Sequence, residues 1–183
     1  MRILRAICRV VFGILFVFSG FIKAIDPIGS ALKIKEYFGA MHLAFMDFLS
    51  IPGAILLSTT EFIIGVAILK GLRINLFSKL ALWFISFFTL LTLWIYLFNP
   101  VSDCGCFGEA IHLSNKATFI KNLVLLAAAL VIFLQRKKIN PIASPKVEWG
   151  YLIAYGALII ALQGYSLRNI PQIDFGIYKS GTD

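Results

Sequence analysis

The stretch "LFSKLALWFISFFTLLTLWIYLF", residues 76–98, is the most hydrophobic part of the chain and decides its fold class. A helix rises about 1.5 Å per residue, so a stretch of this length crosses the hydrocarbon core of a bilayer, which is about 30 Å thick. Lys79 is its one charged residue and lies near its start. The stretch therefore predicts a transmembrane helix.

Four further apolar stretches lie on either side of this one. They are residues 6–25, 51–69, 119–135 and 149–167. Of the 183 residues, 60% are hydrophobic and only 14% are charged, and the mean hydropathy is +0.89. A soluble domain of this size cannot bury so much apolar side chain. We therefore predict an all-α, polytopic membrane protein, with its transmembrane part in residues 1–168 and an extracytoplasmic tail in residues 169–183. Truncation of a longer chain at this tail is left open.

The net charge of +8 comes from basic residues at the ends of the apolar stretches, not from one patch, so it indicates membrane orientation and not nucleic-acid binding. Ten of the 17 basic residues fall on one side of the predicted membrane: Arg2, Arg5, Arg9, Lys70, Arg73, Lys79, Arg136, Lys137, Lys138 and Lys146. The positive-inside rule assigns that side to the cytoplasm. We expect a bacterial inner-membrane protein with a cytoplasmic amino terminus and a periplasmic carboxyl terminus. A signal peptide is the alternative for residues 6–25, but no small-residue cleavage site follows them, which favours a retained helix.

The polar loop "NPVSDCGCFGEAIHLSN", residues 99–115, holds two of the three cysteines and is expected on the periplasmic side. Pro100 ends the preceding helix and Ser114 is a candidate N-cap for the next one. A disulfide between Cys104 and Cys106 would close a small ring, so it is expected to be strained and exchange-prone. It would add little stability, because so short a loop removes little entropy from the unfolded chain.

Thiol–disulfide exchange is the favoured interpretation of this loop, and two alternatives stay open. A reduced Cys104–Cys106 pair with His112 would supply three ligands for Cu(I) or zinc, and a closed zinc site needs a fourth, for example from His42. The cysteines could also simply hold a turn. For exchange, His112 is expected to lower a thiol pKa whereas Asp103 opposes ionisation, so the attacking sulfur is undecided.

Glu61 falls in the middle of the stretch 51–69, where a charge is costly, so we expect it to face the bundle interior with a partner. It either ties helices together or takes part in proton or quinone chemistry. Lys23, near the outer end of the first stretch, is expected to reach the interface or to pair with Asp26 or Glu61.

Three segments resemble known membrane families. "RVVFGILFVFSGFIKAIDP", residues 9–27, and "EFIIGVAILKGL", residues 61–72, are similar to the DoxX-like membrane proteins, and "DCGCFG", residues 103–108, resembles the methylamine utilisation protein MauE family. The resemblance covers about residues 9–135. It implies a four-helix transmembrane bundle, to which residues 149–167 add a fifth helix.

The resemblance also implies a function in the maturation of disulfide-containing envelope proteins, beside a periplasmic thioredoxin-like partner. Carried over to this chain, Cys104 and Cys106 are the exchanging pair and Glu61 is the membrane carboxylate. Quinone, by analogy to membrane oxidants, is the one candidate cofactor. Those oxidants use a second cysteine pair, which this chain lacks on the outer side. The alternative is a non-enzymatic subunit of a larger envelope assembly, in which the loop is structural.

Overall fold

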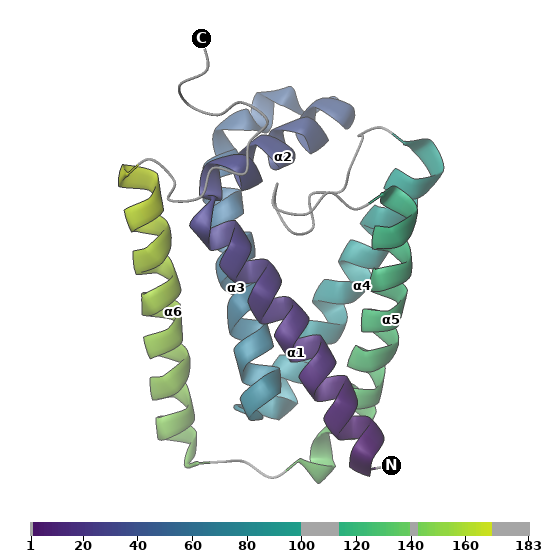
Figure 1. The fold of residues 1–183 in the computed structure, drawn as a ribbon, viewed down its shortest axis with the longest axis vertical. Coiled ribbons are helices and arrows are strands. Elements are labelled where there is room, and N and C mark those ends of the chain that lie inside the picture. Colours follow the sequence, from purple (N-terminus) through teal and green to yellow (C-terminus); the bar gives the residue numbers. More distant parts are fainter. Residues whose placement is uncertain (1, 100–113, 140–142, 170–183) are drawn as a thin grey trace.

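The computed structural model of the chain describes residues 2–99, 114–139 and 143–169, and the regular elements in these ranges are helices (Figure 1). They are, in chain order, α1 (Arg2–Ile25), α2 (Pro27–Ala40), the 3-10 helix η1 (Ala44–Leu49), α3 (Ser50–Lys70), α4 (Ile74–Phe98), α5 (Asn115–Leu134), the 3-10 helix η2 (Arg136–Lys138) and α6 (Pro145–Arg168). Within the described ranges, α1, α3 (together with most of η1), α4, α5 and α6 are long and apolar enough to cross a membrane. The prediction of an all-α polytopic membrane protein is confirmed.

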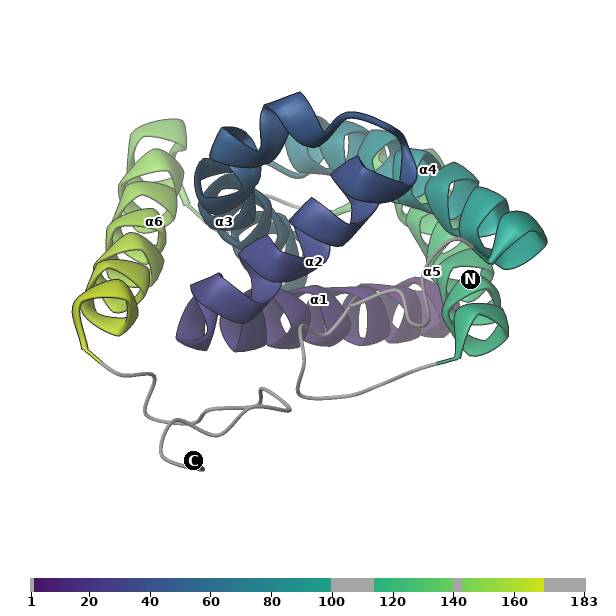
Figure 2. The ribbon, with the colours of Figure 1, turned by 90° about the horizontal axis from the view of Figure 1, so that it is seen from above.

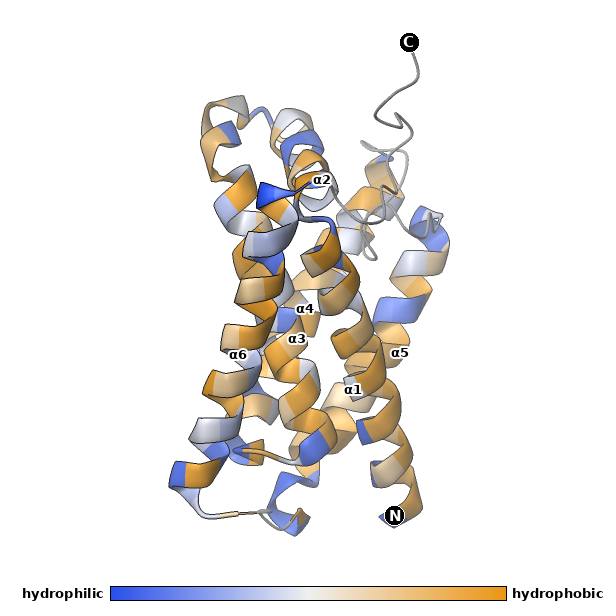
Figure 3. Ribbon diagram, turned by 60° about the vertical axis from the view of Figure 1, so that its left-hand side comes forward, coloured by the Kyte–Doolittle hydropathy of each residue, from blue (hydrophilic) through white to orange (hydrophobic). Residues whose placement is uncertain are grey.

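The surface of the bundle is apolar along its length. Trp83, Leu90 and Ile153 are exposed by 70%, 67% and 68% although they lie within spanning helices. Hydrophobic residues cover the middle of the helices, and hydrophilic residues gather mainly toward the two ends (Figure 3). This distribution suits side chains that face lipid instead of water.

Helices α1 and α3 cross in close contact at glycines (Figure 1). A Cβ atom on Gly20 would lie 2.6 Å from the backbone nitrogen of Phe62, and one on Gly65 would lie 2.6 Å from that of Val17. Small residues let two backbones approach in this way, which is how helices associate without a hydrophobic driving force between them. The glycines therefore fix the geometry of the α1–α3 pair.

A cluster of apolar side chains joins α1, α3, α4 and α5 into the four-helix part of the bundle. Phe12 and Phe16 stack with ring centroids 4.1 Å apart, and Phe16 meets Phe84 of α4 edge to face at 5.8 Å. Leu125 and Ile132 of α5 close the same cluster. Helix α6 packs against the outside of α3 and α1, with Ile159 buried against Phe62 and Val66.

Arg9 of α1 closes one end of α3. Its Nε donates to the carbonyl of Ile68 at 3.1 Å and its Nη2 donates to the carbonyl of Leu69 at 3.1 Å. These carbonyls belong to the last turn of α3 and have no partner within the helix. Gly71 then takes a left-handed conformation (φ 76°) that ends the helix, as glycine commonly does.

Helix α2 lies across one end of the bundle, the end opposite to the amino terminus (Figure 2). The chain turns from α1 into α2 at Asp26, whose Oδ1 accepts from the backbone N–H of Gly29 at 2.8 Å, with Pro27 at the first helical position. Asp-Pro is a typical helix start. We call the end with α2, the last turn of α4 and the first turn of α5 the loop end, and the opposite one, with Arg2, the basic end.

Candidate functional site

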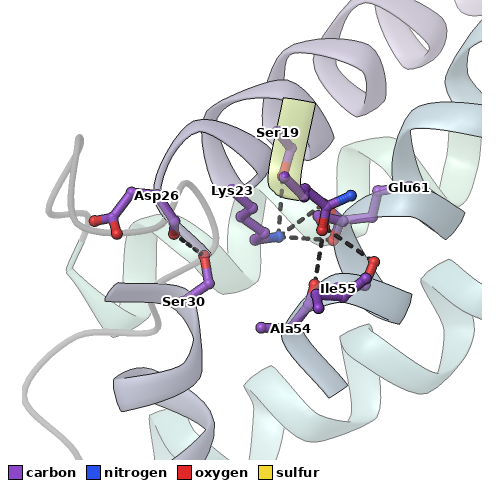
Figure 4. A network of polar contacts seen from close by, with 9 residues as sticks. Ser19, Lys23, Asp26, Ser30, Ala54, Ile55 and Glu61 are labelled. Atoms are coloured by element: carbon purple, nitrogen blue, oxygen red, sulfur yellow. Dashed lines mark hydrogen bonds and ion pairs between the residues drawn. The ribbon is translucent and has the colours of Figure 1, made fainter. Parts of the chain in front are cut away.

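A buried ion pair joins α1 to α3 beneath α2 (Figure 4). The Nζ atom of Lys23 lies 2.8 Å from Oε1 and 2.7 Å from Oε2 of Glu61. The hydroxyl of Ser19 donates to Oε2 at 2.8 Å, and Lys23 also donates to the Ser19 oxygen at 3.1 Å. The side chains of Lys23 and Glu61 are only 6% and 9% exposed. The expected partner of Glu61 is therefore Lys23, with Ser19 as a further donor.

Helical spacing and close packing bring these three residues together. Ser19 and Lys23 are four residues apart on α1, so they lie on the same face of the helix. Gly20, between them, lets α1 approach the α3 backbone at Phe62, next to Glu61. Asp26, the other partner considered for Lys23, caps α2 instead.

Lys23 donates to three oxygen atoms, and both carboxylate oxygens of Glu61 accept hydrogen bonds. Two charges in a low-dielectric interior gain little net stability from pairing, but removal of one partner leaves the other uncompensated, at a cost of about 3–5 kcal/mol. The arrangement thus commits α1 to one register on α3.

A small cavity adjoins Glu61 between α1, α3, α4 and α5. Its volume is ≈ 30 Å³, and its lining includes Ser19, Glu61 and Phe84 together with Lys121 and Asn122 of α5. On this measure a water molecule needs about 10–15 Å³, so the cavity has room for about two. A cavity of this volume does not hold a quinone ring.

The two ends of the cysteine loop lie together at the loop end. Helix α4 ends at Phe98, and the side chain of Asn115 donates to Oδ1 of Asn99 at 3.1 Å. The hydroxyl of Ser114 accepts from the backbone N–H of Ala117 at 3.3 Å, as expected for the N-cap of α5. The predicted site residues Cys104, Cys106 and His112 fall between these anchors, outside the described residues.

The third cysteine, Cys8, is a free thiol in α1. It is partly buried and packs against the main apolar cluster. In the ranges that the structure describes, no three His, Cys, Asp or Glu side chains come close enough together to hold a metal ion. The metal alternative concerns Cys104, Cys106 and His112, which those ranges do not include.

Two polar residues that the sequence analysis did not single out, Asn122 and Glu148, make contacts between other parts of the bundle. The side-chain amide of Asn122 in α5 donates to the hydroxyl of Thr92 in α4 at 3.2 Å. Glu148, in the first turn of α6, is only 3% exposed and accepts from the backbone N–H of Arg73 at 3.1 Å. Asn122 and Glu148 are buried because of the helices that pack against them. The sequence around a single polar residue does not reveal which helices will be its neighbours.

The sequence profile of one family, described as methylamine utilisation protein MauE, matches residues 1–135. The chain belongs to this family. The MauE match spans α1 to α5 and so contains the Lys23–Glu61 pair, the cysteine loop and the Asn99–Asn115 contact. No curated protein and no solved structure matches the chain.

Helix α6 lies outside the residues that the MauE family matches, but both of its ends contact α3, which lies within them. Near the loop end, the hydroxyl of Ser58 donates to Oε1 of Gln163 at 2.9 Å, and Nε2 of Gln163 donates to the hydroxyl of Thr59 at 3.0 Å. Near the basic end, Nζ of Lys70 lies 5.3 Å from the ring centroid of Tyr155. The fifth helix is thus a fixed part of the bundle.

Proposed function

We propose that this MauE-family protein exchanges disulfides at the periplasmic face of the bacterial inner membrane, through Cys104 and Cys106. The feature that carries the proposal is the Cys-Gly-Cys sequence, in the connection between two spanning helices. Its partner is a thioredoxin-like or other envelope protein with a pair of redox-active cysteines. In this proposal the amino terminus is cytoplasmic, and residues 169–183 lie on the same side as the loop.

The geometry of the loop anchors supports this position for the cysteines. Asn99 and Asn115 are in contact, so the connection that carries the cysteines begins and ends at one point of the bundle. Cys104 is five residues from Asn99, so it stays within about 18 Å of that anchor even if the chain is fully extended. A bilayer core about 30 Å thick keeps the pair on the side of the loop end.

The distribution of basic residues supports the orientation. Arg2 and Arg5 of α1 line one pocket with Gln135 and Lys138, which follow α5. The connections α3–α4 and α5–α6 thus bring their basic residues to the end that holds the amino terminus. The positive-inside rule favours the cytoplasm for that end.

The exchange itself is balanced by the two proteins alone. A thiolate of the partner attacks one loop sulfur, the Cys104–Cys106 bond breaks, and a mixed disulfide forms. The partner's second thiolate then attacks the mixed disulfide, which releases the loop as a dithiol and leaves the partner as a disulfide. The loop gains two electrons and two protons, and the partner loses them. In the opposite direction a free loop thiol resolves the mixed disulfide.

This chemistry gives Glu61 a positioning role. Exchange between a dithiol and a disulfide conserves protons, so it requires no proton acceptor in the membrane. The Lys23–Glu61 pair instead fixes α1, and through it α2, at the end of the bundle where the loop begins. His112 stands closer in sequence to the thiols, and an imidazolium near Cys104 or Cys106 would lower the thiol pKa.

Single substitutions of the loop cysteines test the proposal. In a Cys104→Ser or Cys106→Ser variant, the loop has no second thiol to resolve a mixed disulfide. One of the two variants should therefore accumulate a mixed disulfide with the partner protein. The complex should run as a larger species on a non-reducing gel, disappear on reduction, and yield the partner by mass spectrometry. Cys8→Ser, added to the variant that accumulates the complex, is the control and should leave the complex intact.

The result that would overturn exchange is equally direct. If thiol trapping in intact cells finds Cys104 and Cys106 always oxidised, and the double serine variant keeps its function, the loop is structural. The protein would then be a membrane subunit of a larger envelope assembly.

A further inference from the structure

A second buried carboxylate lies near the basic end of the bundle. Glu148 is 3% exposed, although the residues before and after it, 144–147 and 149–150, are exposed. Its Oε2 accepts from the backbone N–H of Arg73 at 3.1 Å, while its Oε1 is buried and has no hydrogen-bond partner among the residues that the structure describes. An acceptor buried in this way costs free energy unless a donor reaches it.

No described side chain neutralises Glu148. The ion pairs found in the described ranges join other residues. Arg73, whose backbone N–H donates to Glu148, has its guanidinium over the ring of Trp149, with Cζ 5.5 Å from the ring centroid. Arg73 also adopts a left-handed backbone (φ 42°, ψ 41°), which residues other than glycine rarely do. This strained turn directs the Arg73 N–H to one carboxylate oxygen of Glu148, Oε2, and the other, Oε1, has no donor among the described residues.

Both residues line a pocket between the α3–α4 turn and the start of α6. Its volume is ≈ 360 Å³, within the range of about 300–1,000 Å³ that is usual for small-ligand sites. Asn75 also lines the pocket, and the remaining described residues of its wall are mostly apolar: Gly71, Ile74, Leu76, Ile139, Ala143 and Pro145. Among the described residues, the lining thus includes one acidic, one basic and one amide residue beside apolar ones.

We propose that this pocket binds the headgroup of phosphatidylethanolamine. The primary ammonium supplies the donor that Oε1 of Glu148 lacks, and the phosphate accepts from the guanidinium of Arg73 and the amide of Asn75. The pocket lies at the end of spanning helices, where phospholipid headgroups are found. Phosphatidylglycerol lacks the ammonium, and the quaternary amine of phosphatidylcholine has no N–H to donate. The chemistry therefore selects the ethanolamine lipid, and this proposal stands apart from thiol exchange.

Native mass spectrometry of the purified, delipidated full chain tests this selection. Phosphatidylethanolamine, phosphatidylglycerol and phosphatidylcholine with identical acyl chains are each added to the protein in detergent. We expect the ethanolamine lipid to bind about tenfold or more tightly than either of the others, as a charge-assisted hydrogen bond implies. Equal retention of all three lipids, or of the glycerol and ethanolamine lipids, overturns the proposal. So does binding of soluble phosphoethanolamine as tightly as the lipid, because the ligand would then not come from the bilayer.

A Glu148→Gln variant locates the site. Its amide oxygen still accepts from the Arg73 N–H, so the turn is kept, but the negative charge is lost. The preference for the ethanolamine over the choline lipid should disappear in this variant. Glu36→Gln, an exposed change on α2, is the matched control and should keep the preference. An unchanged preference in Glu148→Gln overturns the assignment, and the wild-type lipid comparison decides the matter even if the variant does not fold.

Discussion

At the scale of single residues, the buried ion pair of Lys23 and Glu61 makes the effect of replacing one residue on stability depend on the presence of the other. Lys23→Met or Glu61→Gln leaves one buried group without its partner, and we expect each change to lower the free energy of unfolding by about 3–5 kcal/mol. The double variant Lys23→Met/Glu61→Gln removes both charges, so it should cost clearly less than the sum. Unfolding of the purified protein by a denaturing detergent measures all three values.

An exposed ion pair provides the control for these single and double variants. Lys35 and Asp47 lie 3.8 Å apart with side chains 47% and 44% exposed. Removal of either should change stability by no more than about 1 kcal/mol, because water already screens the pair. Additive losses at Lys23 and Glu61 would contradict a direct interaction between them, since only coupled residues deviate from additivity.

Glu61 also shows how much of the candidate site could be predicted from the sequence. Hydropathy places Glu61 in the middle of a spanning helix, and the cost of a charge there already demands a partner. It does not identify that partner, because Lys23 could equally reach Asp26 or the interface. The crossing of α1 and α3 at Gly20 decides it, and that contact joins residues about 40 positions apart in the chain. For the same reason Glu148 gave no signal of its burial.

At the scale of elements, the α1–α3 crossing depends on the absence of a side chain at Gly65. A Cβ atom there would lie 2.6 Å from the backbone nitrogen of Val17, and a backbone cannot move aside as a flexible side chain can. We expect Gly65→Ala to lower the free energy of unfolding by about 1–3 kcal/mol, as overpacking of a core does. Detergent-induced unfolding measures this loss.

Gly164 of α6 is the matched control, since nothing lies within 4 Å of an added Cβ. Gly164→Ala should be neutral or should stabilise the protein by up to about 1 kcal/mol through its higher helix propensity. If both variants behave alike, close packing at Gly65 is not what holds the two helices.

The element boundaries show what an apolar pattern measures. The predicted spans 119–135 and 149–167 begin four residues later than α5 (Asn115–Leu134) and α6 (Pro145–Arg168). Hydropathy follows the part of a helix that lies in hydrocarbon, whereas the helix itself continues through charged residues such as Lys116 to its capping residue. The cap at Ser114 was predictable from its type, because its hydroxyl satisfies a free backbone N–H.

One buried amide contributes to the attachment of helix α6 to the bundle. Gln163 is 1% exposed and bonds to Ser58 and Thr59 of α3, so Gln163→Leu should cost about 1 kcal/mol, as such bonds do within membranes. The loss should be local: backbone amides of α6 should exchange hydrogen for deuterium faster, and those of α1 should not. Leu158→Ala, at a position 62% exposed, is the control without an effect on α6. Faster exchange throughout the chain would contradict a local attachment.

At the scale of the whole molecule, the basic end and the loop end should face different compartments. The test starts from a Cys8→Ser/Cys104→Ser/Cys106→Ser variant, which has no cysteine. Single cysteines are then introduced at exposed positions: Lys35→Cys or Lys116→Cys at the loop end, and Lys137→Cys at the basic end. A maleimide that cannot cross membranes should label the first two in intact spheroplasts, and the third only after the membrane is permeabilised. The physical reason is the retention of lysine and arginine on the cytoplasmic side during insertion. Labelling of Lys137→Cys before permeabilisation would reverse the topology, and the Cys104–Cys106 pair would then face the cytosol, where disulfides are kept reduced.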